Sequence, residues 1–144
     1  MPLGDCRLGL EAIAPDIREM TLQEETLLAP KAWRSTASRR PVVRLLGSYD
    51  TYLMGYASRV HAVSPEREKQ ILPGGGMLRP TICVDGRFVG TWTSAKTQKK
   101  LTVTLEPFGR IEDAWAGEIE AEAKDIARFE GLADAVVGHT PRAK

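Results

Sequence analysis

Few residues in this sequence have the type and spacing that catalysis requires. His61 and His139 are the only histidines. His61 follows a tyrosine-rich segment and is a candidate acid/base group, although a partly exposed histidine without a catalytic role is the favoured interpretation. Asp50 lies between Tyr49 and Tyr52, and it is either a buried functional carboxylate or, as we favour, a structural aspartate that caps a turn. No catalytic residue is therefore predicted for this chain.

Cofactor-binding and metal-binding patterns are also missing from the sequence. The glycine run Gly74–Gly76 lacks the Gly-Lys-Ser/Thr of a phosphate-binding P-loop, and neither a nucleophile elbow nor a zinc-protease motif occurs. Cys6 and Cys83 show no metal-ligand spacing and are expected to be reduced thiols in a cytoplasmic protein, with Cys83 in the core. We therefore expect no cofactor and no metal.

Basic residues, by contrast, are concentrated in the middle of the chain. Residues 31–104 contain thirteen basic and four acidic side chains, a balance of +9, whereas residues 1–30 and 105–144 each carry −4. A surface that binds a polyanion would show this segregation, which the overall charge of +1 hides. The alternative is that the basic and acidic segments pair with each other across the fold. Charge alone does not decide between the two.

The basic middle is organised around the segment from Leu72 to Trp92. Three glycines after Pro73 predict an irregular loop, because glycine reaches positive φ without steric cost. The strand-like runs 81–84 and 88–93 flank Asp85-Gly86, a pair that is typical of a tight hairpin turn. Two arginines accompany this hairpin, namely Arg79 and Arg87.

Weaker signals predict the other elements. We expect a helix over 6–14, a hairpin over 17–29, a linker over 30–40, a strand at 42–46, a helix at 64–71 and a strand at 101–105. From Ile111 to Phe129 apolar residues recur at helical spacing with acids on the other face, and Gly131 ends this helix. Residues 132–144 are expected to form a flexible tail.

These elements predict an α+β fold with a small, mostly antiparallel β-sheet or barrel and a long C-terminal amphipathic helix. Tyr49, Tyr52 and Tyr56 are spaced to share one face of a helical turn, and with Trp92 they are interpreted as barrel core rather than as base-stacking residues. No apolar run approaches the length of a membrane-spanning helix, so no contact with a membrane is expected.

Three motifs resemble the C-terminal region of the AlkZ/YcaQ-like DNA glycosylases, which are also described as winged-helix DNA-binding domain-containing proteins. In order, they are a D-x-Y-L-x-G-Y-x-x-R segment from Asp50 to Arg59, a P-G-x-G-x-x-R-P loop from Pro73 to Pro80 and a V-D-G-x-x-x-G-T-W hairpin from Val84 to Trp92. The resemblance covers roughly residues 17–131. One departure is Ser58, where an aspartate commonly precedes the arginine.

The resemblance implies tandem winged-helix units that scaffold a β-barrel, and an activity that cleaves the N-glycosidic bond of alkylated or cross-linked DNA. The family's catalytic residues lie upstream in a Q-x-Q or Q-x-D motif, which Gln23, Gln70 and Gln98 do not form. The chain would thus lack the N-terminal winged-helix units. Its expected parts are a winged-helix remnant with a linker at 1–40, a β-barrel with its C-terminal helix at 41–131 and the tail at 132–144.

We therefore expect a DNA-binding, DNA-repair-associated module without catalytic residues of its own, whose partner is double-stranded DNA. Its candidate phosphate-binding residues, most of them at one end of the hairpin, are Arg59, Arg79, Arg87, Lys96, Lys99 and Lys100. The Asp85-Gly86 turn is a candidate probe of a DNA groove. The alternatives are a scaffold half that regains glycosylase activity with a partner chain bearing winged-helix units, or self-associates, and a barrel that binds a small molecule.

Overall fold

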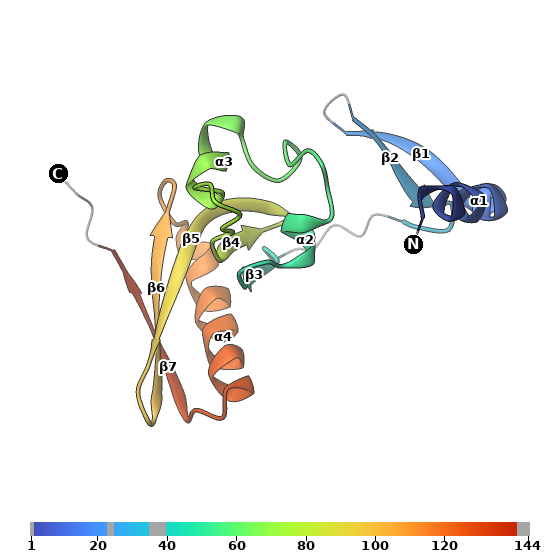
Figure 1. The fold of residues 1–144 in the computed structure, drawn as a ribbon. Coiled ribbons are helices and arrows are strands. Elements are labelled where there is room, and N and C mark those ends of the chain that lie inside the picture. The colour runs from blue at the N-terminus through green and yellow to red at the C-terminus, as the bar shows by residue number, and fades with distance from the viewer. Residues whose placement is uncertain (1, 23–24, 35–39, 141–144) are drawn as a thin grey trace. The chain divides into compact units, whose positions relative to one another are not determined.

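The computed structural model describes residues 2–22, 25–34 and 40–140. The expected turn at Gln23-Glu24, the centre of the expected linker at 35–39 and the last four residues of the expected tail lie outside this part. The chain divides into two compact units, residues 1–37 and 38–144, and each contains its own sheet (Figure 1).

The first unit consists of a helix and a hairpin. α1 (Leu3–Ile13) continues into one 3₁₀ turn, η1 (Ala14–Asp16), which is followed by the antiparallel pair β1 (Ile17–Leu22) and β2 (Glu25–Pro30). The expected helix and hairpin are therefore confirmed in kind. None of the described residues of this unit is buried, and a unit of this size rarely buries enough apolar surface to be stable alone.

The second unit is built on a sheet that curls into a half-barrel (Figure 1). Within the described residues its strands follow one another across the sheet as β3 (Val43–Leu46), β4 (Thr81–Val84), β5 (Arg87–Lys96), β6 (Lys100–Pro107) and β7 (Asp134–His139). The pairs from β3 to β6 are antiparallel, whereas β7 runs parallel to β6. The predicted α+β fold with a mostly antiparallel sheet is confirmed, in the form of an open half-barrel.

The long helix α4 (Asp113–Phe129) packs against the sheet and contacts both of its edge strands, β3 and β7. Its buried residues Ile119, Ala123 and Ala127 join the main core with side chains from β3 to β6. The main-chain N–H of Leu132 donates to the Ala127 carbonyl at 2.9 Å and that of Gly131 to the Arg128 carbonyl at 3.1 Å, the pattern of a Schellman motif. The predicted helix and its end at Gly131 are confirmed.

The segment after α4 differs from the sequence-based expectation. Residues 134–139, expected to belong to a flexible tail, form β7, which pairs with β6 from Lys100↔Asp134 to Leu105↔His139. A parallel strand must be reached by a crossover connection, which α4 provides here. Residues 134–139 show only a weak strand pattern in the sequence. Their pairing with β6 therefore depends on the free edge of that strand, which the chain reaches after α4 has crossed the sheet.

A second, smaller core covers the other face of the β4–β5 hairpin. It is formed by residues from α2 (Thr51–Met54), α3 (Pro65–Ile71), the segment between them and the hairpin itself, namely Leu53, Ala62, Val63, Ile71, Cys83 and Phe88. β4 is therefore buried on both faces, which suits its sequence Thr-Ile-Cys-Val, in which three of the four side chains are β-branched. The expected core position of Cys83 is confirmed.

The aromatic residues divide between core and surface. Trp92 is buried, and its indole Nε1–H donates to the Leu46 carbonyl at 2.9 Å, so its predicted core position is confirmed. Tyr52 is half-buried, but Tyr49 and Tyr56 are exposed, and the core interpretation is wrong for both. α2 is only four residues long, and Tyr49 precedes it with a φ of 60°, so Tyr49 does not share its face. Within the described residues, no helix has the length and apolar content to cross a membrane.

Candidate nucleic-acid interface

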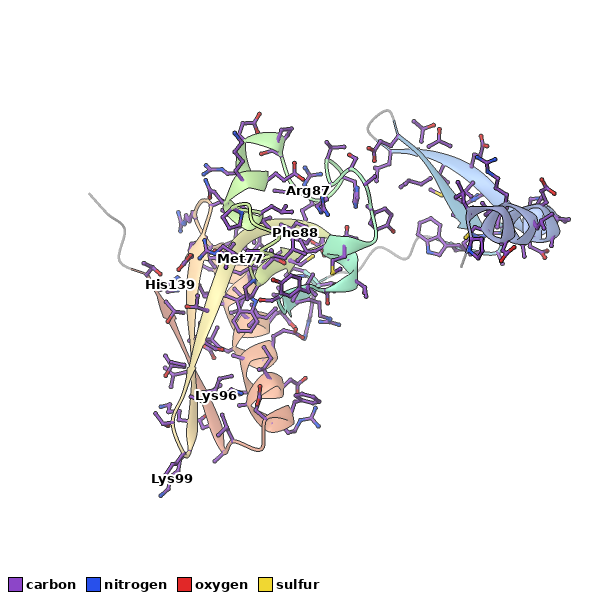
Figure 2. All side chains as sticks on the ribbon, viewed as in Figure 1. Met77, Arg87, Phe88, Lys96, Lys99 and His139 are labelled. Carbon is purple, nitrogen blue, oxygen red and sulfur yellow. The ribbon has the colours of Figure 1, made fainter. Side chains whose placement is uncertain are left out.

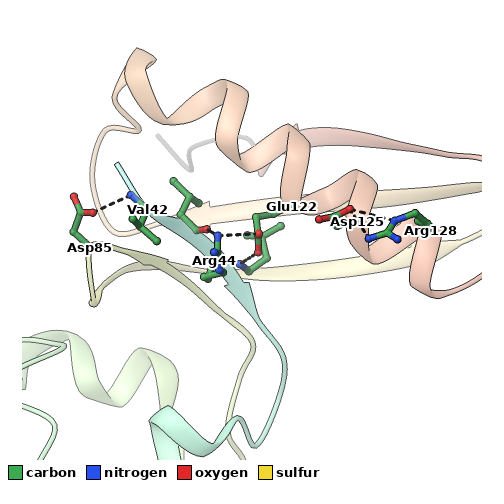
Figure 3. Close-up of polar contacts among 8 residues, drawn as sticks. Val42, Arg44, Asp85, Glu122, Asp125 and Arg128 are labelled. Atoms are coloured by element: carbon green, nitrogen blue, oxygen red, sulfur yellow. Dashed lines mark hydrogen bonds and ion pairs between the residues drawn. The ribbon is translucent and has the colours of Figure 1, made fainter. Parts of the chain in front are cut away.

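The predicted hairpin turn at Asp85-Gly86 is present and is held on both sides. Both residues have positive φ, 49° and 80°, as a tight hairpin turn requires. Asp85 exchanges two hydrogen bonds with the main chain of Val42, each 2.9 Å long, one of which is drawn in Figure 3. On the other side, the Tyr52 hydroxyl donates to the Gly86 carbonyl at 2.9 Å. The candidate groove probe is thus a braced part of the fold.

His61 lies in an aromatic cluster beside this turn. Its ring centroid is 4.8 Å from that of Tyr56 and 5.8 Å from that of Tyr52, and Tyr52 in turn packs on Phe88 at 5.5 Å. Burial raises the pKa of Tyr52 above its ordinary value. The buried Nδ1 atom of His61 has no hydrogen-bond partner among the described residues. The His61 ring is therefore packed among aromatic side chains, and its non-catalytic role stays a prediction.

Asp50 is a structural aspartate. It is the N-cap of α2, and its Oδ1 accepts a hydrogen bond from the Tyr52 main-chain N–H at 2.8 Å. The interpretation of this residue as a capping carboxylate, which the sequence favoured, is confirmed.

Two of the candidate phosphate-binding arginines are engaged within the fold. Arg59 donates from Nε to the Leu53 carbonyl at 2.5 Å and reaches Glu68 at 3.5 Å, and its side chain is only 16% exposed. The Arg79 guanidinium pairs with the Glu106 carboxylate, which also accepts from the Thr91 hydroxyl at 3.1 Å. Both guanidinium groups therefore have partners that a phosphate would have to replace.

Arg79 and Glu106 lie in the wall of an open groove of about 960 Å³, which is also lined by Phe108 and His139. The groove is on the surface of the second unit, whereas the inside of the half-barrel is filled by the main core. This groove is open, unlike the enclosed polar cavity that a barrel with a small-molecule ligand would have.

The candidate basic residues are found at both ends of the sheet. β5 begins at Arg87 and ends at Lys96, and ten residues of strand extend over about 30 Å. Figure 2 shows Arg87 near the braced turn and Lys96 and Lys99 toward the opposite end. The expectation that these residues gather at one end of the hairpin is therefore wrong, because the strand that joins them is long.

The lysine-rich end is a well-defined turn between β5 and β6, which we call the lysine turn (residues 96–100). The Thr97 N–H donates to the Lys100 carbonyl at 2.9 Å, and the Lys100 N–H donates to the Thr97 hydroxyl at 3.1 Å. Lys96, Lys99 and Lys100 are all exposed. Lys99 lies at the very tip in Figure 2. Three ammonium groups are thus carried on a short, ordered turn.

The acidic C-terminal segment neutralises part of the basic middle. Arg44 pairs with Glu122 at 3.2 Å (Figure 3), Lys96 pairs with Glu130 at 2.5 Å, and Arg79 pairs with Glu106. Pairing between the segments, one of the two interpretations of the charge pattern, therefore holds for these three residues. Among the candidate phosphate-binding residues, Arg87, Lys99 and Lys100 form no ion pair with any described residue.

Comparison with known proteins defines the class to which this fold and surface belong. The family model described as DNA glycosylase AlkZ-like matches residues 2–129. The chain therefore belongs to the AlkZ-like DNA glycosylase family.

A curated relative and a solved structure come from Streptomyces sahachiroi. Its interstrand DNA cross-link repair glycosylase is 34% identical over 91 residues, which are 62% of this chain and 24% of that protein. The solved DNA glycosylase AlkZ matches with a TM-score of 0.68 at 23% identity, over 97% of this chain and 38% of that one. The structural likeness shows a shared fold. The chain spans about a quarter of the curated relative and less than two fifths of the solved chain.

Proposed function

We propose that this chain is a DNA-contacting part of a DNA-repair glycosylase and that it corresponds to the C-terminal region of the family. Family membership supports a role in repair, and the cross-link repair activity of the Streptomyces sahachiroi relative supports cross-linked DNA as the substrate of the whole enzyme. The single observation that carries the DNA contact is the lysine turn, which presents three exposed ammonium groups at one end of a long hairpin.

The contact is proposed to be with the phosphate backbone. Lysine is a compact point charge that attracts phosphate without reading base edges, so the binding would be independent of sequence. Each phosphate that a lysine neutralises releases counterions, which makes the affinity fall as the salt concentration rises. Lys99 and Lys100 are the principal contacts because neither is paired with a described carboxylate. Arg87, at the other end of β5 and about 30 Å from the lysine turn, is a secondary candidate for a phosphate contact.

Base excision itself is proposed to require winged-helix units in addition to the residues of this chain, on the same polypeptide or on a partner. Three of the partly buried carboxylates of the second unit, Asp50, Glu106 and Glu122, accept hydrogen bonds within the fold. None of the described residues of the first unit is buried, and winged-helix units that dock on it would cover its apolar side chains. Light scattering of the purified chain would detect self-association, the other way of covering this unit.

Fluorescence anisotropy with a labelled DNA duplex over a range of salt concentrations tests the phosphate contact. The Lys99→Ala/Lys100→Ala variant should bind more weakly, and the slope of log affinity against log salt should decrease in magnitude by up to about 2. The matched control is Lys69→Ala/Arg110→Ala, which removes two charges from the groove region away from the lysine turn.

The control variant should keep the affinity and the slope of the parent chain. Equal losses in the two variants would assign binding to the overall charge rather than to the lysine turn. Absence of binding by the parent chain at low salt would contradict the proposed function.

A further inference from the structure

Phe129, the last residue of α4, has the most exposed large hydrophobic side chain among the described residues, at 90%. A helix places about 100° between successive residues. Phe129 therefore lies roughly 100° from the centre of the apolar stripe that Ile119, Ala123 and Ile126 form toward the sheet. Its exposure follows from its position on the helix.

The same face of α4 contacts the sheet two turns earlier. The Glu122 carboxylate accepts from the Leu45 main-chain N–H at 3.1 Å and pairs with Arg44 on the edge strand β3 (Figure 3). Phe129 follows seven residues later, almost directly in line along the helix and about 10 Å further on. β3 is only four residues long and leaves Phe129 without cover.

Three contacts place the residues that follow Phe129 beside the lysine turn. The next residue, Glu130, binds the Lys96 ammonium at 2.5 Å. The Ala133 main-chain N–H donates to the Lys99 carbonyl at 3.3 Å, and Asp134 lies opposite Lys100 in the register of the parallel strands β6 and β7. The end of α4 and the lysine turn therefore form one surface.

This surface carries more basic than acidic side chains. The basic side chains are Lys96, Lys99, Lys100 and Arg128, and the acidic ones are Asp125, Glu130 and Asp134. Asp125 is bound by Arg128 at 3.0 Å (Figure 3) and Glu130 by Lys96, and Asp134 accepts from the Ala135 N–H at 2.8 Å. The exposed ring of Phe129 and the ammonium groups of Lys99 and Lys100, which pair with no described carboxylate, are therefore carried on the same surface.

We propose that Phe129 stacks on a nucleobase that is not covered by its neighbours, while the lysine turn holds the adjacent phosphates. The proposal rests on the proposed function, because it assigns a base contact to the same surface. Aromatic side chains beside basic residues bind exposed bases in this way, since every base has a face on which a ring can stack. The expected ligand is a duplex with a gap or bulge, in which a base face is accessible.

The test compares a fully paired duplex with a duplex that carries a two-nucleotide gap, using the whole chain. The parent chain should bind the gapped duplex more tightly, and Phe129→Ala should weaken that binding at least about fivefold. The salt slope should not change in Phe129→Ala, because no cation is removed. A 2-aminopurine placed in the gap should change its fluorescence with the parent chain and with Phe129→Trp, but not with Phe129→Ala.

Met77→Ala is the matched control, because Met77 is 57% exposed and lies near the other end of the sheet (Figure 2). It should bind both duplexes like the parent chain. The proposal is overturned if Phe129→Ala binds the gapped duplex as tightly as the parent chain, or if its main effect is a change of oligomeric state. Binding that depends on the lysine turn but not on Phe129 would overturn the stacking proposal and leave the proposed function standing alone.

Discussion

The Tyr52 hydroxyl donates a 2.9 Å hydrogen bond to the main-chain carbonyl of Gly86, 34 residues further along the chain. This bond joins α2 to the β4–β5 turn, which Asp85 joins to Val42 on the other side. The turn is therefore immobilised by two segments. The other end of the long strand β5 leads into the lysine turn, whose exposed ammonium groups are the proposed DNA contact.

Removing the Tyr52 hydroxyl should weaken the attachment of the β4–β5 turn to α2. Tyr52→Phe leaves the Gly86 carbonyl without this donor and should lower the free energy of unfolding by about 1 kcal/mol, as measured by urea denaturation. Tyr49→Phe is the control, because Tyr49 is 53% exposed, and it should change the stability by less than about 0.5 kcal/mol. Equal stability of Tyr52→Phe and the parent chain would show that water replaces the bond without loss.

Two glycines should respond in opposite directions to alanine. A Cβ atom on Gly90 would lie 2.7 Å from the Pro107 Cα and 2.8 Å from the Glu106 carbonyl oxygen, so Gly90→Ala should destabilise the chain by about 3 kcal/mol. Gly117 is exposed inside α4 with nothing near its Cβ position, and Gly117→Ala should raise stability by about 1 kcal/mol. Thermal melting followed by circular dichroism measures both. A stable Gly90→Ala variant would mean that β5 and β6 can separate locally.

The Glu122 carboxylate should anchor the edge strand to the helix. Glu122→Ala removes the acceptor of the Leu45 N–H and the partner of Arg44, and should cost about 1–2 kcal/mol. Glu120→Ala, two positions earlier on an exposed part of α4, should be nearly neutral. Hydrogen exchange of the Leu45 amide provides a local readout and should accelerate only in Glu122→Ala. Unchanged exchange there would show that β3 is held by its pairing with β4 alone.

The Cys83 thiol should make stability depend on alkaline pH. Burial raises the pKa of Cys83 from 9.0 to about 11. The folded chain therefore keeps this proton where the unfolded chain has lost it, so the free energy of unfolding should fall as the pH rises from about 9 to about 11. The decrease should be smaller in Cys83→Ala. A thiol reagent at pH 8 should modify the partly exposed Cys6 and leave Cys83 unmodified until unfolding.

Parallel pH dependence in the parent chain and in Cys83→Ala would contradict this assignment. The pH dependence of the free energy of unfolding would then arise from other groups that lose protons in this range. Tyr52 is one of them, because burial also raises its pKa. The Tyr52→Phe variant, which also tests the hydrogen bond to Gly86, separates the contribution of Tyr52 from that of Cys83.

The residues that sequence reasoning found are those whose role depends on close neighbours in the chain. The Asp85-Gly86 turn, the α2 cap Asp50 and the end of α4 at Gly131 each follow from the φ preferences or the side-chain acceptors of a few consecutive residues. The sequence did not single out Glu106 or Glu130. It placed Phe129 among the apolar residues of the helix, which is wrong, because the side chain is 90% exposed. A helical wheel could have marked Phe129, because it lies off the apolar stripe.

The sequence by itself determined the local elements of this protein, because turn, cap and helix preferences act within a few residues. The positive φ values of Gly74, Gly75 and Gly76 and the long helix α4 are examples. Only the tertiary structure decided that β7 joins β6, that the candidate cations are found at opposite ends of β5, and which of them meet a carboxylate. Those outcomes depend on contacts between segments far apart in the chain, whose free energy is decided by the packing of the whole unit.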